Sequence, residues 1–204
     1  MYVNKLKELI TPPENPVGVG DLQNRKIFEK KLGIKLPTDY YHLLETYGAG
    51  YFGGYFIVYN PFVEHSGFDF LYMLNENRYF YTMMKDDFSE SKTNLFIRKF
   101  RTPNGKYKIC GGEADSYGFP FPFYPEEGGL LPCCEFEGEY TVYWKTGGDK
   151  WTIVVYDCDE FYSEFDMSLT QFLYNLATEK IHFGELYNCF TQKGLIFEKY
   201  VEDE

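Results

Sequence analysis

The segment Leu32–Gly50 constrains the fold of this chain most, because it encodes a helix end, a break and a second helix. Gly33 adopts positive φ at no steric cost, so it fits the position just past a helix spanning about residues 22–32. Pro37 fixes φ near the helical value and is best tolerated at the first helical position. An apolar face at helical spacing then predicts a second, amphipathic helix: Tyr40, Leu43, Leu44 and Tyr47.

The rest of the N-terminal third also shows helix boundaries. Residues 1–10 form a short helical pattern that the proline-rich segment Thr11–Pro16 breaks, and Asp21 is well placed to cap the helix ending before Gly33. Gly48 and Gly50 end the second helix of the pair. The apolar run Tyr55–Tyr59 follows and is expected to be the first strand of a buried sheet.

A third helix and a set of strands fill the middle of the chain. The pattern over Asp69–Lys85 recurs at helical spacing, with Leu71, Leu74, Arg78 and Tyr81 on one imperfectly apolar face. Alternating and apolar runs around turn signals predict two hairpins, one on either side of an aromatic and proline-rich stretch. Their strands are Phe96–Phe100 with Tyr107–Cys110, and Tyr140–Trp144 with Trp151–Tyr156.

Two further segments have clear signals. Three prolines within Tyr117–Pro125 exclude a central strand or helix, so this stretch is expected to be an ordered loop or a sheet edge. Ser168 is expected to cap a final helix that packs on the sheet. The apolar stripe of that helix is Leu169, Phe172, Leu173 and Leu176.

Helices on either side of a run of strands imply an α+β fold, with a largely antiparallel or mixed sheet packed by N-terminal and C-terminal helices. A chain of 204 residues is long enough for one sizeable core, and no repeat or linker divides it. We therefore expect a single domain over residues 1–204, with its core at about residues 20–180. Residues after Glu179 receive no assignment.

The net charge limits the classes of partner. The chain has 31 acidic and 20 basic residues, a formal charge of −11, which disfavours nucleic acid and anionic membrane and favours a cationic partner. The alternative is that the charge only maintains solubility. Aromatic residues make up 21% of the chain and suit a binding surface, although they also suit a β-rich core.

The sequence gives no sign of export, membrane insertion or a metal centre. The N-terminus lacks the apolar core of a signal peptide, and no later run is long enough to span a membrane, so a cytoplasmic protein is expected. The five cysteines show no C-x-x-C pair, so reduced structural thiols are expected instead of a disulfide framework or zinc site. No metal and no cofactor are expected.

Catalytic patterns are also missing. The three histidines, His42, His65 and His182, are not accompanied by a Gly-x-Ser-x-Gly nucleophile motif. Acidic residues such as Glu126 and Asp149 invite comparison with a glycosidase pair, but so acidic a chain brings carboxylates together by chance. We therefore expect that the protein is not an enzyme.

Several motifs occur in an order that resembles the SUKH superfamily. The first is Leu-Gly-x-x-Leu-Pro-x-x-Tyr at residues 32–40, and the second is the Tyr-Pro and Gly-Gly-Leu-x-Pro element within Phe123–Pro132. Tyr143–Trp144, Gly147–Trp151 and Ser168–Leu173 continue the pattern. Cys133–Cys134 departs from it, since a bulky residue followed by a small one is expected there.

This resemblance implies an α+β immunity protein that binds and neutralises a cognate bacterial toxin, commonly a nuclease, as part of a polymorphic toxin system. The acidic chain adds the expectation that the toxin is basic. The alternative is a regulatory scaffold similar to the fungal cell-wall synthesis regulator that shares the domain. Neither reading requires catalysis.

The predicted partner-binding surface combines the loop around residues 117–127 with the hairpin turn 146–151, because loops on a rigid sheet are free to vary with the partner. Acidic side chains are expected to steer the partner and aromatic side chains to anchor it. For the aromatic anchors the alternative is core packing, above all for Trp151, which begins a strand. The candidate residues are Asp115, Tyr117, Tyr124, Glu126, Glu127, Asp149 and Trp151.

Overall fold

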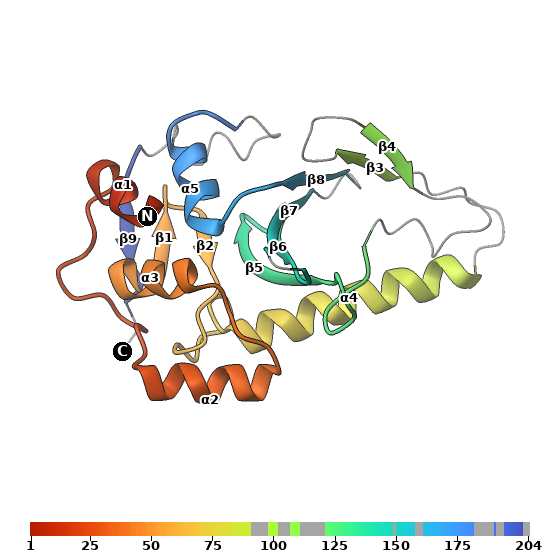
Figure 1. Ribbon diagram of the computed structural model, residues 1–204, viewed down its shortest axis with the longest axis horizontal. Coiled ribbons are helices and arrows are strands. Elements are labelled where there is room, and N and C mark those ends of the chain that lie inside the picture. Colours follow the sequence, from red (N-terminus) through yellow and green to blue (C-terminus); the bar gives the residue numbers. More distant parts are fainter. Residues whose placement is uncertain are drawn as a thin grey trace. The chain divides into compact units, whose positions relative to one another are not determined.

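The structure is a computed structural model that describes residues 1–90, 98–101, 107–110, 121–148, 150–157, 161–181, 190 and 194–201 (Figure 1). The helices are α1 (Tyr2–Leu9), α2 (Leu22–Leu32), α3 (Thr38–Tyr47), α4 (Phe70–Glu90) and α5 (Leu169–Ala177). The strands are β1 (Gly50–Phe52), β2 (Phe56–Val58), β3 (Arg98–Arg101), β4 (Tyr107–Cys110), β5 (Leu130–Phe136), β6 (Tyr140–Lys145), β7 (Thr152–Asp157), β8 (Phe161–Phe165) and β9 (Phe197–Lys199).

The chain forms two compact units. The first comprises Met1–Leu71, Cys134–Glu137 and Ser168–Glu204, and the second comprises Tyr72–Cys133 and Gly138–Met167. Helices and a largely antiparallel sheet confirm the predicted α+β class. The expectation of one domain stays a prediction.

Strands of the first unit lie in the order β9-β1-β2-β5, and all three pairings are antiparallel. Tyr51 of β1 lies between Ile57 of β2 and Glu198 of β9. Gly50 begins β1 where a Cβ atom would clash with the carbonyl of Glu198 and the ring of Phe197. The absence of a side chain at this position therefore allows β9 to approach β1.

Helices α2 and α3 have the predicted boundaries. The Asp21 carboxylate accepts a hydrogen bond from the Asn24 N–H at 2.7 Å, and Gly33 ends α2 with φ 91°. Gly48 ends α3 with φ 71°, where a Cβ would overlap the backbone of Val17. Both glycines therefore occupy positions that other residues reach only with strain.

The apolar face of α3 is buried as predicted. Tyr40, Leu43, Leu44 and Tyr47 are all at most 1% exposed. The Tyr40 hydroxyl donates to the Tyr59 carbonyl at 2.6 Å, and the Tyr47 hydroxyl donates to the Ile10 carbonyl at 2.8 Å. Burial raises the pKa of the Tyr47 phenol, so this hydroxyl remains a donor at neutral pH.

Helix α5 packs against α1 and α3 (Figure 1). The Ser168 hydroxyl accepts a hydrogen bond from the Gln171 N–H, which confirms the predicted cap. The predicted stripe is buried throughout: Leu169, Phe172, Leu173 and Leu176.

Strands of the second unit lie in the order β5-β6-β7-β8-β3-β4. Strands β6 and β7 form the predicted hairpin, with Val142 opposite Val155. Strand β8 is antiparallel to β7 and parallel to β3, which itself pairs with β4. The sheet is therefore mixed, and the predicted pairing of residues 98–100 with 107–110 is confirmed.

Helix α4 divides into a packed face and an exposed face. Leu74 is 4% exposed on the packed face, and the Asn77 side chain accepts a hydrogen bond from the Tyr143 hydroxyl at 2.9 Å. Tyr81, one turn further on, places its ring 5.3 Å from that of Phe123. The face predicted for residues 69–85 is therefore the one that packs.

Four strands have no counterpart in the sequence-based expectations: β1, β5, β8 and β9. The apolar run near Tyr55 is consequently the second strand, since β1 precedes it. Strand β5 contains Pro132 and two cysteines, residues with little strand signal, yet Cys133 and Cys134 are fully buried. Within the described ranges no helix combines the length and apolar character needed to cross a membrane.

Candidate functional site

The loop of residues 121–129 is joined to the β6–β7 turn. The carbonyl of Gly129 accepts two hydrogen bonds from Thr146, one from its N–H and one from its hydroxyl, each at 2.9 Å. Thr146 is itself 5% exposed. The structure thus brings together the described parts of the two segments that the sequence analysis combined into one surface.

Backbone hydrogen bonds also hold the loop internally. The N–H of Leu130 donates to the Pro122 carbonyl at 2.9 Å, and the N–H of Tyr124 donates back to the Leu130 carbonyl at 3.1 Å. At the tip, the N–H of Gly129 donates to the Glu126 carbonyl at 2.9 Å. These bonds close the loop into a fixed turn with residues 126–127 at its apex.

Aromatic rings support this loop from the side of the sheet. The Phe123 ring lies 6.5 Å from that of Tyr143, edge to face. The Phe121 ring lies 6.3 Å from that of Tyr162, and the Lys145 ammonium lies 4.9 Å from the Phe121 centroid. Phe121 and Phe123 are 7% and 5% exposed, so they belong to the support of the loop and not to its outer surface.

The predicted site residues in this region have different exposures. Glu126 and Glu127 are exposed at the apex. Tyr124 is 8% exposed, and burial raises the pKa of its phenol while the Arg78 charge opposes that shift. Trp151 is half-buried, with its ring 5.9 Å from that of Trp144. Packing therefore accounts for Tyr124 and for part of Trp151, and the anchor role of either stays a prediction.

Three predicted site residues lie outside the described residues, namely Asp115, Tyr117 and Asp149. The same holds for His182 and for the turn of residues 102–106. Their predicted roles stay predictions.

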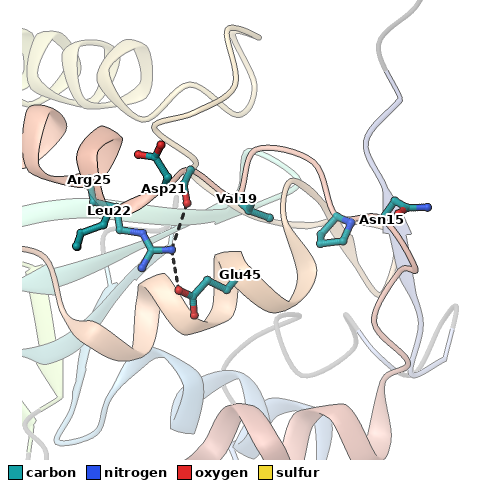
Figure 2. A pocket seen from close by; sticks show the side chains of 8 residues that line it. Asn15, Val19, Asp21, Leu22, Arg25 and Glu45 are labelled. Atoms are coloured by element: carbon teal, nitrogen blue, oxygen red, sulfur yellow. Dashed lines mark hydrogen bonds and ion pairs between the residues drawn. The ribbon is translucent and has the colours of Figure 1, made fainter.

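A hollow of about 680 Å³ lies in the first unit, between the segment before α2 and helix α3 (Figure 2). The side chain of Arg25 lies in it and donates to Glu45 at 2.8 Å and to the Gly20 carbonyl at 3.3 Å. The guanidinium also lies 4.9 Å from the Tyr41 ring centroid. The lining residues are Asn15, Pro16, Val19, Gly20, Asp21, Leu22, Arg25 and Glu45.

This hollow has no catalytic arrangement. Arg25 is engaged by Glu45, and Asp21 caps α2, so the charged groups already serve structure. No lining residue is a serine, cysteine or histidine. Of the residues at this hollow, the sequence predicts a role only for Asp21, as a helix cap, because the hollow depends on the approach of residues 15–25 to Glu45.

The described histidines have structural neighbours. His42 Nδ1 lies 3.0 Å from the Met1 sulfur, and His65 Nδ1 accepts a hydrogen bond from the Gly67 N–H at 3.2 Å. The His65 ring also lies 5.1 Å from that of Tyr200. Among the residues that the structure describes, no three His, Cys, Asp or Glu side chains are arranged to hold a metal ion.

Glu135 on β5 is a half-buried carboxylate with a perturbed pKa. Partial burial raises this pKa, and a hydrogen bond from the Tyr59 hydroxyl at 3.1 Å opposes the rise. The residue lies opposite Ile57 in the sheet. Within the described part of the chain no histidine or second carboxylate is hydrogen-bonded to Glu135, so its position there is a structural one.

Comparison with protein families identifies the family of this chain. The family model SUKH_6, described as SMI1-KNR4 cell-wall, matches residues 23–173 of this chain. No curated protein and no solved structure matches it. The matched span contains α2 except for its first residue, then α3, the loop of residues 121–129 and the β6–β7 hairpin.

Proposed function

This chain belongs to the SUKH_6 family of the SUKH superfamily, and from this premise we propose that it binds a cognate toxin and neutralises it by direct contact. Membership supports a binding role of the immunity-protein or SMI1-KNR4 kind. That the partner is a toxin, and that this toxin is basic, is our proposal. Such a protein would act in the cytoplasm of the cell that makes it.

The observation that carries the proposal is the exposed Glu126–Glu127 pair on a fixed loop. Hydrogen bonds within the loop and from Thr146 hold the pair in place before any partner arrives. A preorganised surface loses less conformational entropy on binding than a mobile one. The loop is thus suited to present two adjacent negative charges to a basic surface.

Charge supplies the association step of the proposed mechanism. A net charge of −11 attracts a basic protein over distances of about a Debye length, roughly 8 Å at physiological salt. Glu126 and Glu127 then provide local complementarity to cationic side chains. Electrostatic steering of this kind changes the association rate more than the final affinity.

We propose further that neutralisation needs no catalysis, cofactor or metal. No serine, cysteine or histidine lines the hollow beside Arg25, and the proposed action depends on covering a surface of the toxin. The purified protein is expected to show no turnover of esters, peptides, nucleotides or glycans. Activity that persists through denaturation and refolding would contradict this.

Co-expression tests the proposal directly. The probe is a candidate toxin domain taken from a neighbouring gene, produced with and without the chain in a susceptible host. Rescue of growth, together with a complex of fixed stoichiometry by light scattering, would support the proposal. Toxicity that is unchanged by the chain, with no complex between the purified proteins, would refute it.

The description of the matched family favours a second candidate. The words SMI1-KNR4 cell-wall fit the alternative of a regulatory scaffold similar to the fungal cell-wall synthesis regulator. A gene without a neighbouring toxin, whose deletion changes growth or wall integrity, would favour this candidate. A toxin neighbour with loss of protection on deletion would favour immunity.

A further inference from the structure

Helix α4 presents large apolar side chains to solvent. Tyr79 is 69% exposed, Phe80 is 43% exposed and Met83 is 38% exposed. Glu76, one turn before Tyr79 and Phe80, is also exposed. Residues three and four apart are neighbours on a helix surface, so these side chains form one continuous patch, here called the α4 stripe: Glu76, Tyr79, Phe80 and Met83.

Packing of the opposite face fixes the orientation of this stripe. Leu74 is buried, Asn77 accepts a hydrogen bond from Tyr143, and Tyr81 packs on Phe123. These contacts orient the helix, so α4 cannot rotate to bury Tyr79 without losing them. The stripe is therefore a stable feature of the folded second unit.

A surface helix normally has a polar outer face, because exposed apolar side chains gain nothing from the folded state. Contiguous exposed apolar patches mark interaction sites. Tyrosine, phenylalanine and methionine are also enriched where proteins bind each other. The composition of the stripe thus indicates a protein contact.

The charge on the stripe indicates which kind of partner fits it. Glu76 supplies the carboxylate of the stripe, and within the described part of the chain no ion pair involves it. An arginine side chain can bind both the carboxylate and the aromatic rings of the stripe, because its guanidinium pairs with a carboxylate and stacks on aromatic rings. A second copy of this chain is disfavoured, since it would bring two −11 molecules together at a face that carries a carboxylate.

We propose that the α4 stripe is a docking surface for a basic protein segment that presents arginine side chains. The stripe is a separate surface from the Glu126–Glu127 loop. The proposal specifies only the chemistry of the partner segment, so it applies equally to a toxin and to a signalling protein.

The probes are two fluorescein-labelled helical peptides of equal length and charge, one with arginines and one with lysines at the same positions. Fluorescence anisotropy at 50 mM and 150 mM salt measures their binding. The arginine peptide is expected to bind the wild-type protein about fivefold more tightly than the lysine peptide, because arginine also stacks on the rings. No binding of the arginine peptide, or equal binding of both, would overturn the proposal.

Substitutions locate the site. Tyr79→Ser is expected to weaken binding of the arginine peptide about tenfold, and Glu76→Gln about threefold. Ile27→Ser is the matched control, because Ile27 is 59% exposed on α2 and lies outside the stripe. Circular dichroism and thermal unfolding verify that each variant is folded.

Two further measurements complete the design. Hydrogen exchange on the wild-type protein is expected to show protection over residues 76–83 when the arginine peptide is added. Binding that is unaffected by Tyr79→Ser and lost in the double variant Glu126→Gln/Glu127→Gln would place the site on the loop and overturn the proposal. Sedimentation that shows a dimer abolished by Tyr79→Ser would assign the stripe to a second copy instead.

Discussion

The carboxylate of Asp39 accepts two hydrogen bonds from Thr170, one from its backbone N–H at 3.0 Å and one from its hydroxyl at 3.1 Å. Asp39 lies in the first turn of α3 and Thr170 in the first turn of α5. Ser168 caps a different N–H of the same turn, that of Gln171. Asp39, which is far from α5 in the sequence, thus completes the capping of the α5 N-terminus, where negative charge is favourable.

Replacing Asp39 is expected to destabilise the fold. Asp39→Ala leaves the Thr170 N–H and hydroxyl without their acceptor in a partly buried position, at a cost of about 2–3 kcal/mol in the free energy of unfolding. Urea unfolding measures this cost. Asp166→Ala is the control, because it breaks an exposed ion pair with Lys150 and is expected to cost about 0.5 kcal/mol or less. Equal effects of the two substitutions would contradict the assigned role of Asp39.

Leu173 is fully buried on α5, so Leu173→Ala is expected to cost about 2–5 kcal/mol through lost contacts and a residual cavity. The same variant tests the prediction of a single domain. Both tryptophans, Trp144 and Trp151, belong to the second unit, whereas Leu173 belongs to the first.

If the chain unfolds as one cooperative domain, Leu173→Ala must shift the fluorescence transition of Trp144 and Trp151 by as much as the circular dichroism transition. A shift in circular dichroism alone would show that the units unfold independently. The surface substitution Ile27→Ser serves as the control and is expected to move neither transition by more than about 0.5 kcal/mol.

Charge reversal at the loop apex separates binding from stability. The double variant Glu126→Lys/Glu127→Lys is expected to slow association with the cognate toxin about tenfold at low salt and to flatten its salt dependence. Thermal stability stays within experimental error because both side chains are exposed. Stopped-flow kinetics measure the rate.

The control for this variant is Glu8→Lys/Glu14→Lys, which changes the net charge equally at exposed positions in the first unit. A similar slowing in both double variants would show that only net charge matters. Unchanged association in the Glu126 and Glu127 variant would place the binding surface elsewhere.

The raised pKa of Glu135 predicts that the free energy of unfolding depends on pH. Its pKa in the folded state lies above the ordinary value of 4.5, so folding favours the protonated form. The contribution of protonated Glu135 to the stability of the fold is therefore fully present below pH 4.5, and it is lost as pH rises through the folded-state pKa. Glu135→Gln keeps an acceptor for the Tyr59 hydroxyl but cannot ionise, so it is expected to be more stable than wild type at pH 7.

Urea unfolding of both proteins from pH 4 to pH 8 measures this difference. The advantage of Glu135→Gln is expected to shrink as pH falls toward 4.5. An advantage that is constant across this range, or a loss of stability at pH 7, would show that ionisation of Glu135 does not oppose folding.

Local sequence determined the elements whose signals lie within a few residues. Asp21 and Ser168 cap their helices, Gly33 ends α2 in the left-handed region, and the spacing from Tyr40 to Tyr47 selects the buried face of α3. Each of these follows from backbone geometry or from the 3.6-residue period, which depend on near neighbours alone. The β6–β7 hairpin belongs to the same group, because its turn and alternating strands are contiguous.

Only the tertiary structure determined the strands, exposures and hydrogen bonds that depend on residues far apart in the sequence. Strands β1 and β9 are only three residues long, and they exist because a glycine lets distant segments meet. Helical periodicity placed Tyr79 opposite the packed face, but only the packing of α4 shows that a ring remains exposed there. The Asp39–Thr170 bond and the union of Gly129 with Thr146 likewise require the folded chain. These contacts cannot be predicted from the sequence alone, because a hydrogen bond between residues far apart in the chain leaves no recognisable pattern among neighbouring residues.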